Sequence, residues 1–200
     1  MIFTLSGASG AGKTSIARGL LKELPIDTRM VPSYTTSTRQ RRESDLPGEY
    51  KYISKFWFWL LEKIGVFIWT VYPHGNRYGT TKRWATKALK DDDTVYIMIL
   101  TPKTINDLRK FAEQTRYSNR IFSSYIVSPP QEILRERLGS RGDKEDEIEK
   151  RLADCIKWDS EARISGIPYE FVENNGVIED TVERVITSFL EKLDACNYYF

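Results

Sequence analysis

The 200-residue sequence predicts an α/β fold of three layers, with helices on both faces of a parallel sheet. Two observations lead to this prediction. Short apolar runs typical of buried strands alternate along the chain with longer amphipathic segments typical of helices. The first apolar run, residues 2–5, leads directly into a glycine-rich loop and then a helix, as in units that open a parallel sheet. We expect one folding unit that carries an insertion.

The glycine-rich loop, residues 7–14, reads Gly-Ala-Ser-Gly-Ala-Gly-Lys-Thr and fits the phosphate-binding pattern G-x-x-x-x-G-K-[ST]. We call it the P-loop. Its glycines let backbone N–H groups point at phosphate oxygens, and a helix that begins at Lys13 or Thr14 adds the positive end of its dipole. Lys13 would reach the β- and γ-phosphates of a nucleotide, and the Thr14 hydroxyl would ligate Mg²⁺. The predicted nucleotide contacts here are Gly7, Ala8, Ser9, Gly10, Ala11, Gly12, Lys13, Thr14 and Ser15.

The other elements follow in order after Pro25, which ends the first helix. We expect strands at 30–33, 50–53, 67–72, 78–80, 95–100, 122–127 and 170–172. We expect helices in the first part of 56–69, at 81–89 and 105–114, after Pro129-Pro130 to about 138, from 146, and over the apolar positions at 182–193. The run at 95–100 is continuously apolar, which is typical of a strand inside a parallel sheet.

The middle of the chain differs in composition from the rest. Residues 34–80 are rich in tyrosine, arginine and turn signals, and we expect them to form an inserted lobe that binds the acceptor. The core would then comprise residues 1–33 and 81–200. Glycines at 139–142 interrupt an arginine-rich segment, so residues 138–152 are expected to form a lid that closes over a transferring phosphoryl group.

Two groups of cations suit phosphate. Arg39, Arg41 and Arg42 accompany Tyr50 and Tyr78 in the middle lobe, where arginine forks and tyrosine hydroxyls can bind phosphate oxygens. The alternative is a solvated basic loop. The second group surrounds the expected lid and comprises Arg135, Arg137, Arg141 and Arg151. The alternative there is a set of surface charges paired with nearby acids, above all for Arg135.

Composition and charge limit the kinds of molecule that the protein is expected to bind. Thirty Lys and Arg residues against 28 Asp and Glu residues give a formal net charge of +2, too little to favour a nucleic acid polymer. Cys155 and Cys196 show neither zinc-site spacing nor a disulfide framework, which fits a reducing compartment. We therefore expect a cytoplasmic monomer or homodimer that acts on a small phosphorylated molecule and binds no membrane.

The stretch at 56–69 is strongly apolar but is interrupted by Glu62, Lys63 and Gly65. It is also far shorter than the roughly 20 residues that a membrane-spanning helix needs. We expect a helix followed by a buried strand. Its excess of Trp and Phe leaves open an exposed aromatic patch that another chain covers.

Several of these segments together resemble guanylate kinase, and the resemblance runs in order from residue 2 to about 189. The matching segments are residues 6–14, Ser-Tyr-Thr-Thr at 33–36, Arg39-x-x-Arg42, His-Gly-Asn-Arg-Tyr-Gly-Thr-Thr at 74–81, Arg137-Leu-x-x-Arg141-Gly142, and Lys-Arg-Leu at 150–152. Many families share the P-loop. The segment at 74–81 and the arginine-rich lid are much more specific.

The resemblance implies a P-loop kinase fold and ATP-dependent phosphorylation of a nucleoside monophosphate, with Mg²⁺. The implied contacts to the acceptor phosphate are Ser33, Arg39, Arg42, Tyr50 and Tyr78, with a one-residue insertion at Ser37 before Arg39. The implied lid arginines, which are catalytic in the family, are Arg137, Arg141 and Arg151, acting with Lys13. Asn174 corresponds to an asparagine near the adenine of ATP.

The departures from the family concern the base. Trp69 stands where the family has an acid that reads guanine, and Met98 and Leu100 stand where it has two aspartates. One of those aspartates helps to organise Mg²⁺ and the other helps to read guanine. Thr80 keeps a hydroxyl at a base-contacting position, and Trp69 could stack on a ring or fill the pocket. Phosphate handling is therefore expected to be kept and base selectivity to be weakened.

Three functions remain open from the sequence. The first is a nucleoside monophosphate kinase with GMP or dGMP as the default acceptor. The second is a sugar-phosphate kinase like the ribose 1,5-bisphosphate phosphokinases, which resemble guanylate kinases and also lack the base-reading acids. The third is a non-catalytic module like the guanylate kinase-like scaffold domains. Those domains lose the P-loop that this chain retains.

Overall fold

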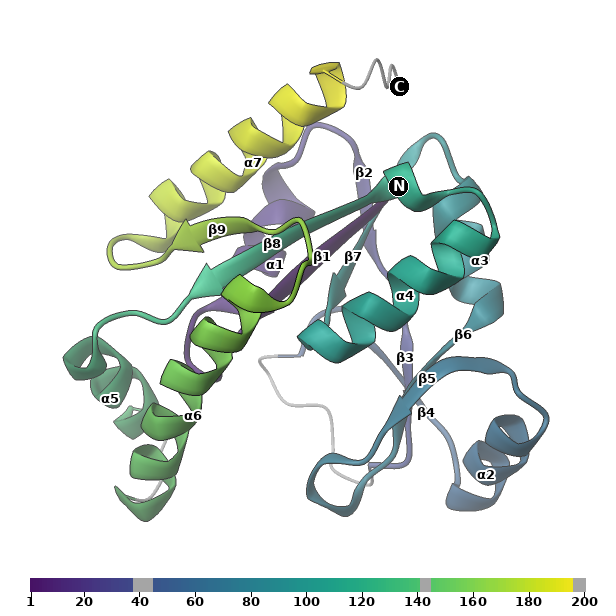
Figure 1. Ribbon diagram of the computed structural model, residues 1–200, viewed down its shortest axis with the longest axis horizontal. Coiled ribbons are helices and arrows are strands. Elements are labelled where there is room, and N and C mark those ends of the chain that lie inside the picture. Colours follow the sequence, from purple (N-terminus) through teal and green to yellow (C-terminus); the bar gives the residue numbers. More distant parts are fainter. Residues whose placement is uncertain (38–44, 141–144, 196–200) are drawn as a thin grey trace. The chain divides into compact units, whose positions relative to one another are not determined.

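The computed structural model describes residues 1–37, 45–140 and 145–195, and Figure 1 shows the elements along the chain. The strands are β1 (Ile2–Gly7), β2 (Asp27–Met30), β3 (Ser33–Thr35), β4 (Tyr50–Tyr52), β5 (Phe67–Val71), β6 (Tyr78–Thr81), β7 (Thr94–Ile99), β8 (Ile121–Val127) and β9 (Glu170–Glu173). The helices are α1 (Lys13–Glu23), α2 (Lys55–Lys63), α3 (Lys82–Lys90), α4 (Pro102–Gln114), α5 (Gln131–Gly139), α6 (Glu145–Ile164) and α7 (Ile178–Ala195). Two short 3₁₀ turns are η1 (Pro73–Gly75) and η2 (Ser118–Arg120).

A five-stranded sheet has the order β2-β7-β1-β8-β9. Its β2/β7 and β8/β9 pairs are parallel. All six residues of β1 are buried, as are the first five of β7, which is the burial that two-sided coverage of a parallel sheet requires. The predicted α/β fold with a parallel sheet is confirmed.

The expected single strand at residues 30–33 is wrong. The segment is the junction of two strands, since β2 ends at Met30 and β3 begins at Ser33. Pro32 lies between them and has no N–H to donate to a ladder. On one side of it the Val31 N–H donates to the Ile97 carbonyl at 3.0 Å, and on the other the Ser33 N–H donates to the Glu49 carbonyl at 2.8 Å. The chain therefore changes sheets at this proline.

The described residues group into two compact units. One unit comprises residues 4–24, 99–102 and 122 onward and contains the P-loop. Within it, the rings of Phe122 in β8 and Phe189 in α7 lie 5.2 Å apart, whereas Tyr125 in β8 donates to Asp159 in α6 at 2.9 Å. Helices α6 and α7 therefore cover opposite faces of β8, because side chains alternate along a strand. This gives three layers.

The other unit comprises residues 1–3, 25–98 and 103–121. It contains a four-stranded sheet with the order β4-β3-β6-β5, in which β6 is antiparallel to both of its neighbours and β3 is parallel to β4. Helix α2 packs on this sheet through Phe58, whose ring stacks on Phe67 at 4.7 Å. The division of the chain into a core, an insertion at 34–80 and a lid at 138–152 remains a prediction.

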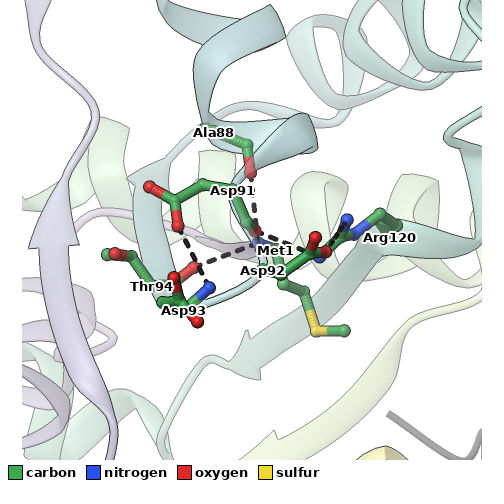
Figure 2. Close-up of polar contacts among 7 residues, drawn as sticks. All are labelled: Met1, Ala88, Asp91, Asp92, Asp93, Thr94 and Arg120. Carbon is green, nitrogen blue, oxygen red and sulfur yellow. Dashed lines mark hydrogen bonds and ion pairs between the residues drawn. The ribbon is translucent and has the colours of Figure 1, made fainter. Parts of the chain in front are cut away.

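The α-amino group of Met1 lies in a ring of carbonyls between α3 and β7 (Figure 2). It donates to the carbonyls of Ala88, Asp91 and Thr94 at 3.0–3.1 Å. Arg120 closes the cluster by donating to the Asp91 carbonyl and to the Asp92 carboxylate. Burial, followed by repulsion from Arg120, lowers the pKa of the amine to about 5. These bonds hold the start of β1 against the turn before β7.

Among the described residues, the helices are all too short or too polar to cross a membrane.

Candidate active site

The P-loop connects β1 to α1 and has a conformation that requires glycine. Gly7 and Gly12 have φ angles of 143° and 100°, which side-chain-bearing residues rarely adopt. A Cβ atom would also lie 2.5 Å from the Ile126 carbonyl oxygen at Gly7 and 2.2 Å from Asn174 Nδ2 at Gly12. The two glycines are therefore needed both for the turn and for its close packing.

Lys13 and Thr14 form the first turn of α1, which begins directly after Gly12. The Lys13 ammonium group donates to the Ala8 carbonyl at 2.7 Å, so the cation lies against the loop and not in solvent. No acidic residue stands in the first turn of α1, so the positive end of the helix dipole is not neutralised by its own side chains. This end of α1 is suited to an anion such as a phosphate.

Asn174 follows β9 and connects that strand to the P-loop. Its Nδ2 atom donates to the Ala11 carbonyl at 2.8 Å, and its Oδ1 atom accepts from Thr181 Oγ1 at 3.3 Å. The side chain is 1% exposed. The resemblance to guanylate kinase implied an adenine contact for Asn174, which stays a prediction, and the structure shows a contact between its side chain and the loop. Sequence reasoning missed Thr181, because a threonine in the first turn of a helix reads as a local cap.

Two of the expected lid arginines reach the same neighbourhood. Arg151 in α6 donates to the Ser9 hydroxyl at 3.1 Å, and Arg137 in α5 donates through Nη2 to the Asn174 carbonyl at 3.2 Å. The Nη1 atom of Arg137 is buried and has no hydrogen-bond partner among the described residues. A buried guanidinium donor without a partner fits an anionic oxygen that enters from outside the chain. Arg141 lies outside the described residues.

Apolar side chains of α5 and α6 pack against the P-loop. Ala8 lies in an apolar cluster with Leu134, Leu138, Ile148, Leu152 and Cys155. The Cys155 thiol contacts the Ser9 carbonyl at 3.8 Å, and burial raises the pKa of this thiol, which keeps it protonated and unreactive.

A cavity of about 360 Å³ lies nearby, at the carboxyl ends of β8 and β9. None of the predicted site residues lines it.

The chain offers little for a metal by itself. Within residues 1–37, 45–140 and 145–195, no three His, Cys, Asp or Glu side chains cluster closely enough to hold an ion. Met98 is buried, and Leu100 is half-buried with its N–H bonded to the Leu5 carbonyl at 2.9 Å. The donor that fits Mg²⁺ is the Thr14 hydroxyl, which would share the ion with the phosphates of a nucleotide.

The second unit brings the predicted acceptor residues together on one face of its sheet. Cross-strand pairing sets Ser33 beside Tyr50, and Trp69 beside Thr80, and paired residues share a face. The rings of Tyr50 and Tyr78 lie 6.0 Å apart. Burial and the nearby Glu49 raise the pKa of Tyr50, so its hydroxyl stays a neutral donor. Arg39 and Arg42 lie outside the described residues.

Trp69 lies in β5 at the end of this face that holds Thr80. Its side chain is 8% exposed, and that of Thr80 is 1% exposed. A tryptophan presents an apolar ring and one N–H donor, whereas a carboxylate presents two acceptors. Trp69 therefore supplies no carboxylate at this position to accept the donors on the edge of a guanine.

Comparison with known proteins agrees with this geometry. The family model described as guanylate kinase matches residues 2–193. Guanylate kinase from Helicobacter pylori is 33% identical over 158 residues, which cover 78% of this chain and 72% of that protein. Guanylate kinase from Thermotoga maritima is 30% identical over 188 residues, which cover 93% and 84% of the two chains.

Solved structures support the fold. The crystal structure of guanylate kinase from Anaplasma phagocytophilum superposes with a TM-score of 0.63 at 23% identity, covering 96% of this chain and 85% of that one. Shikimate kinase from Acinetobacter baumannii gives a TM-score of 0.50 at 17% identity, covering 96% and 93%. The family match over residues 2–193 and the relatives of at least 30% identity establish that this chain belongs to the guanylate kinase family, whose members are ATP-dependent phosphotransferases.

Proposed function

We propose that the protein transfers the γ-phosphoryl group of ATP to the phosphate of a nucleoside 5′-monophosphate, releasing ADP and a nucleoside diphosphate. The observation that carries this proposal is the intact P-loop, with Lys13 bonded at the loop and an unneutralised helix end behind it. A scaffold module has no need of these features. They support catalysis over the non-catalytic alternative.

The reaction needs positioning and charge neutralisation more than covalent help from the protein. A phosphate monoester has a second pKa near 6, so the acceptor is already largely dianionic at neutral pH and its oxygen is the nucleophile. An acceptor oxygen forms a bond to the γ-phosphorus as the bond to the β,γ-bridging oxygen breaks. The chain therefore requires no side chain as a general base.

The roles of the residues follow from their charges. Lys13, Arg137 and Arg151 would neutralise the oxygens of the transferring group, joined by Arg141. Thr14 would help to hold the Mg²⁺ that accompanies ATP, and the ion would neutralise further charge on the phosphates. In the acceptor lobe, Ser33, Arg39, Arg42, Tyr50 and Tyr78 would bind the acceptor's phosphate whatever its base.

We further propose that GMP and dGMP are the default acceptors but are weakly selected. Trp69 stands where the family has an acid that reads guanine, and Met98 and Leu100 stand where it has two aspartates, one of which also reads guanine. Acids that accept hydrogen bonds from guanine would be left unpaired by another base, and this cost disfavours that base. A pocket without such acids discriminates less between bases. The same replacements favour a sugar-phosphate kinase as the second candidate function. The face shared by Tyr50, Tyr78 and Thr80 supports the nucleotide instead.

A coupled assay of ADP release tests the proposal. The wild-type protein should release ADP when ATP, Mg²⁺ and GMP are all present. The Lys13→Ala variant should retain its thermal unfolding temperature and lose this activity, because Lys13 acts on phosphate charge and not on the core. A Lys22→Ala variant is the matched control, since Lys22 is an exposed residue in the last turn of the same helix. Wild-type turnover by Lys13→Ala would overturn the P-loop assignment.

A further inference from the structure

Helix α2 presents aromatic side chains to solvent. Of its nine residues only Phe58 is buried. Phe56 is 62% exposed, Trp57 56% and Trp59 44%, and Ile64, directly after the helix, is 65% exposed. The ring of Phe56 lies 5.7 Å from that of Trp57 and 6.2 Å from that of Trp59, so these three aromatic side chains form one continuous patch. We call Phe56, Trp57, Trp59 and Ile64 the aromatic face.

The side of α2 that faces the sheet already packs on it through other residues, so the aromatic face is not needed to form the core. Phe58 stacks on Phe67 in the sheet. One turn later, Glu62 accepts from Thr70 Oγ1 at 2.7 Å and from Arg77 Nη1 at 2.9 Å. Phe58 and Glu62, four residues apart, therefore define the side that packs on the sheet. The residues of the aromatic face lie away from that side and are 44–65% exposed.

The segment of the chain that carries the aromatic face is strongly basic in sequence. Residues 50–90 contain eight basic residues and one acidic residue, Glu62. The basic residues are Lys51, Lys55, Lys63, Arg77, Lys82, Arg83, Lys87 and Lys90. Because this segment has a net charge of +7 and the whole chain one of +2, the rest of the chain is acidic overall. Glu62 is paired with Arg77, so it does not offset the lysines at the border.

Three exposed lysines lie along the helix and its end. Lys55 and Lys63 are the first and last residues of α2, and both are exposed. Lys82 is exposed as well, and its N–H donates to the Val66 carbonyl at 2.9 Å, next to the C-terminal end of α2. The aromatic face is therefore bordered by ammonium groups.

We propose that the aromatic face docks on the surface of a bilayer that contains anionic lipids, which revises the expectation from composition that the protein binds no membrane. Tryptophan and phenylalanine partition into the headgroup region, and lysines at the border interact with anionic headgroups. Interfacial helices combine these two features and lie on a membrane without crossing it. The proposal does not depend on which acceptor the kinase uses.

The charges and side-chain types disfavour two other occupants. In a two-fold dimer formed through α2, Lys55 and Lys63 of one copy would approach the same lysines of the other, and like charges repel. Single-stranded nucleic acid would use aromatic rings for base stacking, but the aliphatic Ile64 adds nothing to stacking. A lipid surface uses the aromatic rings, the aliphatic side chain and the lysines together.

Co-sedimentation with vesicles tests the proposal. The probes are vesicles of phosphatidylcholine alone and vesicles of phosphatidylcholine and phosphatidylglycerol in equal parts. The wild-type protein should bind the anionic vesicles about tenfold more tightly than the neutral ones, and raised salt should weaken that binding. Trp57→Ser/Trp59→Ser and Lys55→Gln/Lys63→Gln should each weaken it about tenfold while kinase activity stays unchanged.

The matched control is Ile156→Ser/Ile164→Ser, because these two aliphatic residues of α6 are also strongly exposed but lie outside the aromatic face. This variant should bind the anionic vesicles as the wild type does. Failure of the folded wild-type protein to bind anionic vesicles would overturn the proposal. So would a concentration-dependent dimer, or binding to a single-stranded oligonucleotide, that Trp57→Ser/Trp59→Ser abolishes without any vesicle binding by the wild type.

Discussion

The side-chain amide of Asn174 donates a hydrogen bond to the backbone carbonyl of Ala11 at 2.8 Å, across 163 positions of sequence. This bond ties the segment after β9 to the middle of the P-loop. Gly12 packs so closely against the same amide that a Cβ atom there would lie 2.2 Å from Nδ2. The shape of the nucleotide site therefore depends on a residue from the far end of the sheet.

Asn174→Ala should destabilise the protein by about 1–3 kcal/mol, because it removes the buried side-chain donor to the Ala11 carbonyl and one hydrogen bond of the Thr181 hydroxyl. The KM for ATP should rise as the loop loses its brace. Urea denaturation and steady-state kinetics measure the two effects. Asn175→Ala is the matched control, since that neighbour is exposed and bonds only to Glu173 among the contacts described for its side chain. Equal behaviour of the two variants would contradict the bracing role.

Arg137→Ala should lower kcat by about 10²-fold, because its partnerless Nη1 atom is expected to meet charge that develops in the transition state. Arg135→Ala, two residues earlier, should leave kcat unchanged, since the Arg135 side chain is exposed and paired with Glu145 and Glu149. Rapid-quench measurement of phosphoryl transfer distinguishes the two variants. A rise in KM for ATP without a fall in kcat would move Arg137 to ground-state binding.

Asp159→Asn should destabilise the protein by about 1–3 kcal/mol, because three donors converge on this carboxylate. Its oxygens accept from the Tyr125 hydroxyl, the Ser128 hydroxyl and the Ser128 N–H at 2.9–3.1 Å. An asparagine would turn an NH₂ group towards one of those donors. Asp154→Asn, at an exposed position of the same helix, should have no effect. Unfolding midpoints that shift equally in both variants would refute this account.

Local patterns predicted much of the fold. The continuous apolar run of β7 and the regular apolar spacing of α7 each specify an element without reference to the rest of the chain. The junction at Pro32 was not predicted, because it depends on which strand each backbone group meets on either side of that proline. An exposed aromatic patch at 56–69 was left open by the composition, but the residues that form it could not be named from the sequence. Apolar composition indicates burial, but only the packed structure shows that Phe58 is the one buried residue of α2.

The part of the candidate site that is formed by consecutive residues could be predicted from the sequence. The P-loop is complete within eight positions, and its residue types follow from phosphate binding. The bond from Asn174 to Ala11, and that from Arg151 to Ser9, join distant segments and are not encoded in any local pattern. The common face of Ser33, Tyr50, Tyr78 and Thr80 likewise depends on strand register, which one residue of slip would reverse.

The proposed retention of phosphate binding with loss of guanine recognition is tested by the acceptor selectivity of the enzyme, measured as kcat/KM. The measurement compares GMP, dGMP, AMP, dTMP, dUMP and ribose 1,5-bisphosphate for the wild type and Trp69→Glu. We expect the wild type to accept GMP and at least one other nucleoside monophosphate within about 100-fold, and Trp69→Glu to shift the preference towards guanine. Strict GMP selectivity in the wild type would show that other residues recognise guanine, and activity on ribose 1,5-bisphosphate alone would identify a sugar-phosphate kinase; either result would overturn the proposal.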